Sequence, residues 1–372
     1  MSPADHAFQQ LAHIFSTRAN RVLEIEILPP TLGGPLLQDG CSIGITKKFL
    51  AQAFVTARQV FFEGSKDLEK SEASLTNSSS EDGNTCRLKS VEDISVASEI
   101  ILLFDCEHLT ACNWRKRSLM VLTQNHSPKT PIDHETLIHA LSSEVTLMST
   151  FMCSPLRRHT KSPTLWEHRL WVLKHLLRAQ ASTLAQPQTE PQSSAMENML
   201  ELWKEEVSVV FRAGELHPRN YYAFSYLREL HHVLSSGMED SVGCATVLAQ
   251  SANGSTLEWC LAHTTDISGW MFLLYLLHAI PNVAIRTNTI TKAVCFARDI
   301  GWEGESLWTF VDLAASAFLL DGPVTDTLSI AHNPVAEARA RPNDKTRKDG
   351  ARWEPRWKGW MAMARAYRAN SQ

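Results

Sequence analysis

The stretch Ser162–Leu176 reads SPTLWEHRLWVLKHL, and its apolar residues recur at helical spacing. Trp166, Leu170 and Leu173 lie four and three residues apart, which predicts one buried face of an amphipathic helix. Two further stretches share its layout of a polar lead-in, an aromatic anchor and a leucine-rich turn, namely Pro218–Leu230 and Ser268–Leu277. The chain therefore contains a repeated helical unit.

Weaker copies at Leu109–Met120 and Glu305–Ala314 extend this series on both sides. The five copies place their anchors at Cys112, Trp166, Phe224, Trp270 and Trp308. One helical hairpin cannot bury its apolar face alone, so consecutive hairpins stack against one another. The pattern predicts an all-α fold, an α-α superhelix (a solenoid of about five helical hairpin repeats) with an irregular N-terminal arm.

Shifts in composition divide the chain further. Val22–Leu28 alternates polar and apolar residues and predicts an extended segment, whereas Ile100–Phe104 favours a buried helix. The predicted order is an N-terminal arm with the first helices (1–62), a disordered loop (63–90), the helical repeats (91–320) with a linker at 179–195, a charged loop (321–350) and a closing amphipathic helix (351–372).

Charge and composition exclude several classes of protein. The 372 residues carry a net charge of −4, which argues against a globally basic nucleic-acid binder. The longest apolar run, Trp270–Ile280, is far shorter than the roughly 20 residues of a membrane span, and the first residues do not resemble a signal peptide. The eight cysteines are scattered, as is typical of reduced intracellular proteins. We expect a cytoplasmic protein without stable membrane insertion.

The segment Arg339–Arg368 differs in charge from the rest of the chain. It contains ten Lys and Arg residues and three acidic residues, an excess of +7, together with a helical stripe of aromatic residues. An acidic partner, a membrane surface and nucleic acid are possible ligands for such a segment. The simpler interpretation is a closing helix with its apolar side inward and its basic side outward.

The copies at Thr164–Leu173 (TLWEHRLWVL) and Arg219–Phe224 (RNYYAF) resemble the repeat of the protein prenyltransferase α-subunit family, most closely the branch of α-subunit repeat-containing proteins. Three further features match that branch: the arm VLEIEILPP, the hairpin with Asn113 and Arg115, and the D-x-S-G-aromatic element at Asp266–Trp270. The chain also departs from the family pattern. Only the second copy keeps the His-Arg pair, as His168 and Arg169, and Cys112 replaces the first repeat tryptophan.

The resemblance implies a partner. In this family the α subunit wraps a β subunit, which holds the zinc ion, the isoprenoid diphosphate pocket and most catalytic groups. A lysine five residues before the repeat tryptophan meets the diphosphate, and Lys161 has that spacing from Trp166. Tyr221 matches a family tyrosine near the same pocket, with Arg219 beside it. Alternatively, Lys161 is a solvated loop lysine that ends a basic run.

The remaining motif residues have structural interpretations. Cys112, Asn113, Arg115, Trp166, His168, Arg169, Asn220, Phe224, Trp270 and Trp308 are repeat-motif positions. His168 and Arg169 could be catalytic, but an arginine fork beside an aromatic anchor is suited to fixing neighbouring helices by hydrogen bonds. We expect no metal site in this chain, since the histidines and cysteines lack ligand spacing. We also expect no independent catalytic motif, since the sequence contains no G-x-S-x-G, Walker A or G-x-G-x-x-G pattern.

Two hypotheses follow. The first is an α-like, non-zinc-binding subunit of a heterodimeric protein prenyltransferase, with geranylgeranyl transfer to a cysteine of a protein substrate. The second is a helical-repeat adaptor without a transferase role, which the loss of His-Arg in the third to fifth copies favours. The hypotheses differ in whether Lys161 and the Asn220-Tyr221 pair face the same concave surface of the solenoid.

Overall fold

The computed structural model describes residues 2–74, 81–124, 131–184, 192–238 and 240–318. The α-helices of these residues are α1 (Pro3–Ser16), α2 (Lys47–Ser74), α3 (Glu81–Phe104), α4 (Leu109–Gln124), α5 (Pro131–Cys153), α6 (Pro163–Leu184), α7 (Gln192–Leu216), α8 (Tyr221–Ser236), α9 (Ser241–Ala262), α10 (Ile267–Ala279), α11 (Val283–Asp299) and α12 (Glu305–Phe318). Three strands, β1 (Glu24–Leu28), β2 (Leu36–Asp39) and β3 (Ser42–Thr46), and a 3-10 helix, η1 (His159–Lys161), complete the list. The predicted charged loop (321–350) and closing helix (351–372) lie outside the described residues.

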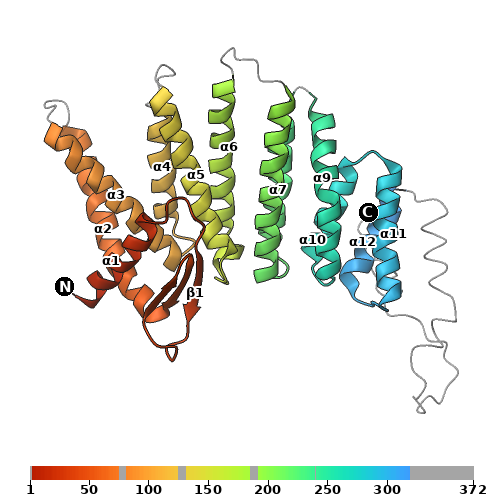
Figure 1. Ribbon diagram of the computed structural model, residues 1–372, viewed down its shortest axis with the longest axis horizontal. Helices are drawn as coiled ribbons and strands as arrows, with labels where there is room; N and C mark the ends of the chain where they lie inside the picture. The colour runs from red at the N-terminus through yellow and green to blue at the C-terminus, as the bar shows by residue number, and fades with distance from the viewer. Residues whose placement is uncertain (1, 75–80, 125–130, 185–191, 239, 319–372) are drawn as a thin grey trace, which may run out of the picture. The chain divides into compact units, whose positions relative to one another are not determined.

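The chain divides into two compact units. Unit 1 comprises Met1–Ser194 with Ser208–Tyr226, and unit 2 comprises Ala195–Val207 with the residues from Leu227 onward. In unit 1, α5 packs against α6 and α3 against α4; in unit 2, α9 packs against α10 and α11 against α12 (Figure 1). The predicted all-α, helical-repeat fold class is confirmed.

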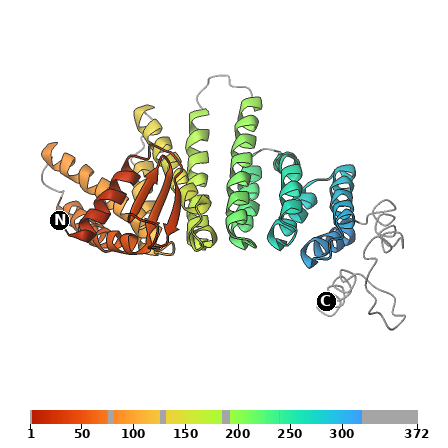
Figure 2. The same ribbon diagram turned by 60° about the horizontal axis from the view of Figure 1, so that its bottom comes forward.

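The N-terminal arm is more regular than the sequence predicted. Its helix α1 begins with a capping box, in which Ser2 and Asp5 satisfy each other's backbone N–H groups. The strands form a sheet of order β1-β3-β2, in which β1 and β3 are parallel and β2 and β3 antiparallel; Figure 2 shows it next to α1. The extended segment within Val22–Leu28 is confirmed as β1. Sequence periodicity missed β2, which has only four residues, and β3, whose alternating Ile43 and Ile45 lead directly into α2.

The edge of this sheet is tied to a helix. The backbone N–H of Leu23 donates to Thr150 Oγ1 (3.0 Å) and that of Ile25 to Ser154 Oγ (2.8 Å), and both hydroxyls belong to α5. Ile25, Ile43 and Ile45 are buried on one face of the sheet. The arm is therefore an integral part of unit 1, since α5 satisfies the open edge of β1.

Two predicted irregular segments are largely helical. The prediction of a disordered loop over 63–90 is wrong for residues 63–74 and 81–90, which belong to α2 and α3. Residues 75–80 lie outside the described part of the chain. The sequence of 63–74 is polar but contains three Glu and two Lys residues, which favour helix, and it continues a helix already nucleated at Lys47. Likewise the linker at 179–195 is shorter than predicted, because α6 extends to Leu184 and α7 begins at Gln192. The helix expected at Ile100–Phe104 is confirmed within α3.

The five anchors lie at equivalent points of their helices. All five are buried, and each follows the helix N-cap position by four residues. In four copies the side chain at the cap position accepts a hydrogen bond from the backbone N–H three residues later. The pairs are His108 and Ala111, Ser162 and Leu165, Asn220 and Ala223, and Asp266 and Gly269. A shared cap geometry sets the same register in each of these repeats.

Each anchor tryptophan also fixes the loop before its own helix. Trp166 Nε1 donates to the carbonyl of Thr160 (2.9 Å), Trp270 Nε1 to that of Thr264 (3.0 Å), and Trp308 Nε1 to that of Trp302 (2.8 Å). The acceptor is always six residues upstream. A buried tryptophan N–H needs such a partner, so the loop geometry and the anchor are specified together.

None of the helices in the described ranges combines the length and the apolar character that a membrane span requires.

Candidate functional site

The predicted diphosphate-proximal residues flank one buried hydrogen bond in unit 1. Asn220 Nδ2 donates to the carbonyl of Thr160 (2.5 Å), which also accepts from Trp166 Nε1. Both Asn220 and Thr160 are buried. Because Lys161 follows Thr160, and Arg219 and Tyr221 flank Asn220, this hydrogen bond brings the three predicted residues into one neighbourhood.

Lys161 and Arg219 are equivalent residues of consecutive repeats. Each lies five residues before its anchor and directly before the cap residue, Ser162 or Asn220. Lys161 is half-buried at the end of η1, and Arg219 is exposed before α8. Two cations and two helix N-termini therefore lie at one edge of the repeats in unit 1, an arrangement that favours anions.

Tyr221 lies at the surface beside them. It is 64% exposed, and its ring makes an edge contact with Tyr222, with ring centres 5.8 Å apart. An exposed tyrosine is available to a ligand or a partner chain, whereas Asn220 is not. The structure thus separates the neighbours Asn220, which holds the repeats together, and Tyr221, which faces outward.

Arg219 has an unusual backbone. Its φ angle of 59° lies in the left-handed region, which costs a residue with a Cβ atom roughly 1–2 kcal/mol. The loop before α8 turns here so that Asn220 can reach the Thr160 carbonyl. The backbone conformation of Arg219, from which its side chain projects, is therefore constrained.

The side chains of the His-Arg pair in the second repeat form hydrogen bonds to the preceding helix. His168 Nε2 donates to Glu144 Oε1 (2.6 Å), and Arg169 Nη1 donates to the carbonyl of Val145 and to Ser149 Oγ (both 2.9 Å). All the acceptors belong to α5, and both side chains are buried. The pair holds α6 against α5, and it does not open to solvent.

Arg115, which occupies the same repeat position as Arg169, makes similar contacts. Its guanidinium forms a bidentate pair with Glu144 (2.8 and 2.5 Å) and bonds Ser98 Oγ (2.7 Å) in α3. Glu99 then joins Arg115 (3.4 Å) to Arg18 (2.9 Å). Two arginines, two glutamates and a histidine thus form one buried network. Through Arg18, which follows α1, it ties the N-terminal arm to the first two repeats.

This network shifts the acidity of its members. Burial opposes protonation of His168, but the Cys112 thiol beside the ring and the Glu144 carboxylate outweigh burial and raise the pKa of His168 to about 9. Burial alone would raise the pKa of Glu144, yet Arg115 and His168 hold it well below its usual range. Burial raises the pKa of Glu99 despite its two arginine partners. These shifts favour the protonated form of His168 at neutral pH.

The copies that lack His-Arg replace it with buried apolar residues. Tyr226 and Phe310 stand where His168 stands, and each packs on the anchor of the preceding repeat. The ring centres of Trp166 and Tyr226, and of Trp270 and Phe310, are 5.0 Å apart. The arginine position is filled by the buried residues Leu227, Leu273 and Val311. The change is one of core packing, and the surface of these repeats is not involved.

The remaining predicted motif residues lie as follows. Asn113 is exposed on α4, whereas Phe224, Trp270 and Trp308 are fully or almost fully buried. Sequence reasoning missed Arg18, in the loop after α1, and Glu99 and Glu144, in α3 and α5, since single acids and bases at scattered positions form no motif. The one available signal was the need of a buried Arg115 or His168 for an acidic partner.

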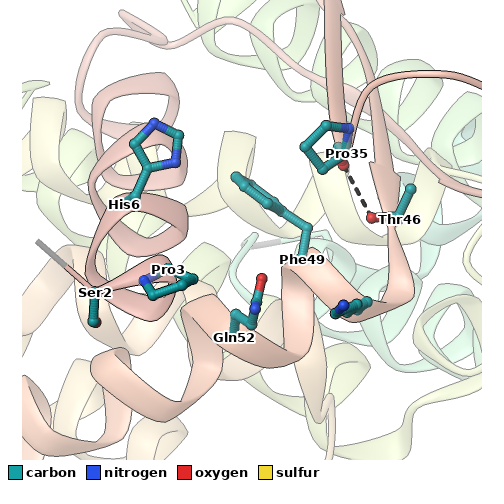
Figure 3. Close-up of a pocket in the computed structure, with 8 residues that line it drawn as sticks. Ser2, Pro3, His6, Pro35, Thr46, Phe49 and Gln52 are labelled. Atoms are coloured by element: carbon teal, nitrogen blue, oxygen red, sulfur yellow. Dashed lines mark hydrogen bonds between the residues drawn. The ribbon is translucent and has the colours of Figure 1, made fainter.

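A cavity of about 450 Å³ lies elsewhere in unit 1, between α1, the strands and the start of α2. Figure 3 shows the Phe49 ring between His6 and Pro35 at this cavity. None of the predicted site residues lines it. In addition, no group of three or more His, Cys, Asp or Glu side chains within the described ranges could hold a metal ion.

Comparison with known proteins finds distant similarity. A family model described as the ECM9 middle domain matches residues 170–295, which run from α6 into α11. The protein prenyltransferase alpha subunit repeat-containing protein 1-B of Xenopus laevis is 25% identical over 166 residues. The alignment covers 41% of this chain and 35% of the relative. The chain thus spans about a third of the curated relative that it matches.

Proposed function

We propose that this chain is an α-like subunit of a heterodimeric protein prenyltransferase, which supports a catalytic β subunit and does not bind zinc itself. The observation that carries the proposal is the hydrogen bond from Asn220 to the Thr160 carbonyl. It sets the backbone of Lys161 beside those of Arg219 and Tyr221, the residues that the resemblance assigns to the diphosphate. The distant similarity to a protein named for the prenyltransferase α-subunit repeat supports the same assignment.

In the proposed reaction a cysteine thiolate of a protein substrate attacks the first carbon of an isoprenoid diphosphate. The sulfur–carbon bond forms as the carbon–oxygen bond breaks, and the electron pair leaves with the diphosphate. Lys161 and Arg219 would stabilise the negative charge that develops on this leaving group. A zinc ion held by the β subunit would supply the thiolate by lowering its pKa.

The proposed acceptor is a cytosolic protein substrate, with geranylgeranyl as the isoprenoid. Lys161 and Arg219 contact the diphosphate in this scheme, and Tyr221 contributes from the exposed side of the same neighbourhood. None of the three would touch the isoprenoid chain, so the β subunit would set the chain length. This chain would not be catalytic alone.

The proposal is tested by co-expression with the prenyltransferase β subunits of the same organism, followed by size-exclusion chromatography and a transfer assay. We expect a one-to-one complex with one of them. Lys161→Ala and Arg219→Ala should each slow turnover about tenfold or more without loss of the complex. Lys47→Ala, which removes an exposed lysine at the start of α2, is the matched control. Equal activity of Lys161→Ala and the wild type would remove Lys161 from the site.

The rival assignment, a helical-repeat adaptor, rested on the lost His-Arg pairs. Those positions are buried in the structure, so their change gives no evidence that a partner-facing surface has diverged. A chain that elutes alone in the presence of every β subunit would nevertheless establish the adaptor as the better assignment.

A further inference from the structure

A second surface of unit 1 has a composition of its own. On α4, Asn113, Lys116, Arg117 and Met120 follow i, i+3, i+4, i+7 spacing and form one outward stripe. On α6 the corresponding stripe is Glu167, Trp171, Lys174 and Arg178. We call these eight residues the α4–α6 basic face. It carries four cations and one carboxylate.

The two stripes are joined by a direct contact. Lys116 Nζ lies 5.8 Å from the centre of the Trp171 ring, a cation–π distance, and α4 packs against α6. The Trp171 ring in turn lies 4.0 Å from that of His175. Since Trp171 and Lys116 are both half-buried, the ring remains partly open to a ligand. The eight residues therefore form one continuous surface.

Three of the four cations of this face have no acidic partner among the residues that the structure describes. In the parts of the chain that the structure describes, Lys116, Arg117 and Lys174 form no ion pair, and α4 contains no acidic residue at all. The exposed arginine of α7, Arg212, differs, because it pairs with Glu24 and Glu215. In a chain whose net charge is negative, three cations without ion pairs beside a partly exposed tryptophan have the composition of a recognition surface.

We propose that the α4–α6 basic face binds an acidic segment of a partner protein. Glutamate or aspartate side chains of that segment would pair with Lys116, Arg117 and Lys174, and an apolar side chain would cover Trp171 and Met120. The exposed apolar residues Met120 and Val121 favour a protein segment, since a purely electrostatic contact with phosphates would not need them. The proposal does not depend on the transferase assignment.

The same pairing of a cation and a ring recurs in unit 2, at the same repeat positions. Arg228, four residues after the anchor Phe224, lies 5.9 Å from the ring of Tyr275, which is five residues after Trp270. Lys116 and Trp171 have these offsets from Cys112 and Trp166. The pairing therefore occurs at two of the four junctions between consecutive repeats; the other two have Leu170 with Glu229 and Leu274 with Leu313 at these positions.

The test measures binding of the full chain to a fluorescein-labelled, glutamate-rich peptide that contains leucine, by fluorescence anisotropy at low and at physiological salt. We expect saturable binding that weakens as salt rises. The double variant Lys116→Glu/Lys174→Glu should bind about tenfold more weakly. Lys47→Glu/Lys292→Glu changes the net charge equally at exposed lysines of α2 and α11 and should bind as the wild type does. Circular dichroism checks that all variants are folded.

Three results would overturn the proposal. The first is that the peptide does not bind the wild type. The second is that both double variants weaken peptide binding equally, which would indicate a response to net charge alone. The third is that the wild type binds phosphatidylserine vesicles through Lys116 and Lys174 in preference to the peptide. The last result would make the face a membrane contact.

Discussion

Asn220 of the third repeat donates a hydrogen bond to the carbonyl of Thr160 in the second repeat. Ser162 makes the same link one repeat earlier, since its Oγ donates to the carbonyl of Cys106 (3.2 Å). In both cases the cap residue of one helix reaches the carbonyl six residues before the preceding anchor. The cap residue therefore starts its own helix and also sets the spacing to the neighbouring repeat.

Replacement of Asn220 tests this double role. Asn220→Ala removes both the cap and the link and should destabilise unit 1 by about 2–3 kcal/mol in urea unfolding. Asn220→Asp keeps a good cap but places an acceptor against the Thr160 carbonyl. We expect it to be at least as destabilising as alanine, whereas a residue that acted only as a cap would tolerate aspartate without loss.

The repeats could be predicted because their signal is local. A large aromatic residue at one helix position, followed by leucines, fixes both the helix and its buried face, and Trp166, Trp270 and Trp308 are buried as expected. The neighbourhood of Lys161 and Tyr221 came from resemblance, since nothing within either segment indicates that Asn220 meets Thr160. That contact joins residues 60 positions apart.

The buried charge network could not be predicted for the same reason. Glu144 lies in α5 and Glu99 in α3, each in an ordinary helical sequence, and only the fold brings them to Arg115. The helical ends at 63–74 and 179–184 were missed for a different reason. Low hydrophobicity indicated a loop, whereas helix propensity and continuity with a buried helix decide such segments.

Stability should depend on pH through His168. The folded state raises its pKa to about 9, above the ordinary value of 6.5, so the folded state binds more protons between these values. The stabilisation is fully present below pH 6.5 and is lost as pH rises through 9. A pKa shift of this size corresponds to about 3 kcal/mol in the free energy of unfolding.

Urea unfolding at a series of pH values from 6 to 10 measures this loss, with His168→Gln as the comparison. Glutamine can still donate to Glu144 but does not titrate, so the variant should lack this part of the pH dependence. Other groups that titrate in the same range affect both proteins equally. Parallel curves for the two proteins would show that His168 is neutral in the folded state.

Gly269 should tolerate no side chain. A Cβ atom there would lie 2.4 Å from the Trp259 ring and 3.2 Å from Cys260 Sγ, so the close approach of α9 and α10 depends on glycine. Gly269→Ala should destabilise unit 2 by about 1–3 kcal/mol in thermal or urea unfolding. Gly254→Ala, on the exposed side of α9 with no atom within 4 Å, should instead be neutral or stabilising by up to about 1 kcal/mol. The prediction fails if the two variants are equally stable.

Two substitutions of Arg219 distinguish the effect of its backbone strain from the function of its side chain. Its left-handed φ angle means that Arg219→Gly should be more stable than Arg219→Ala, by about 1 kcal/mol in urea unfolding. Lys161 does not have a positive φ angle, so Lys161→Gly should be less stable than Lys161→Ala, the reverse of the order at Arg219. In the complex with a β subunit, both Arg219 variants should lose transfer activity to the same extent, because both lack the guanidinium. If Arg219→Gly kept full activity, the left-handed turn and not the charge would be what the site requires.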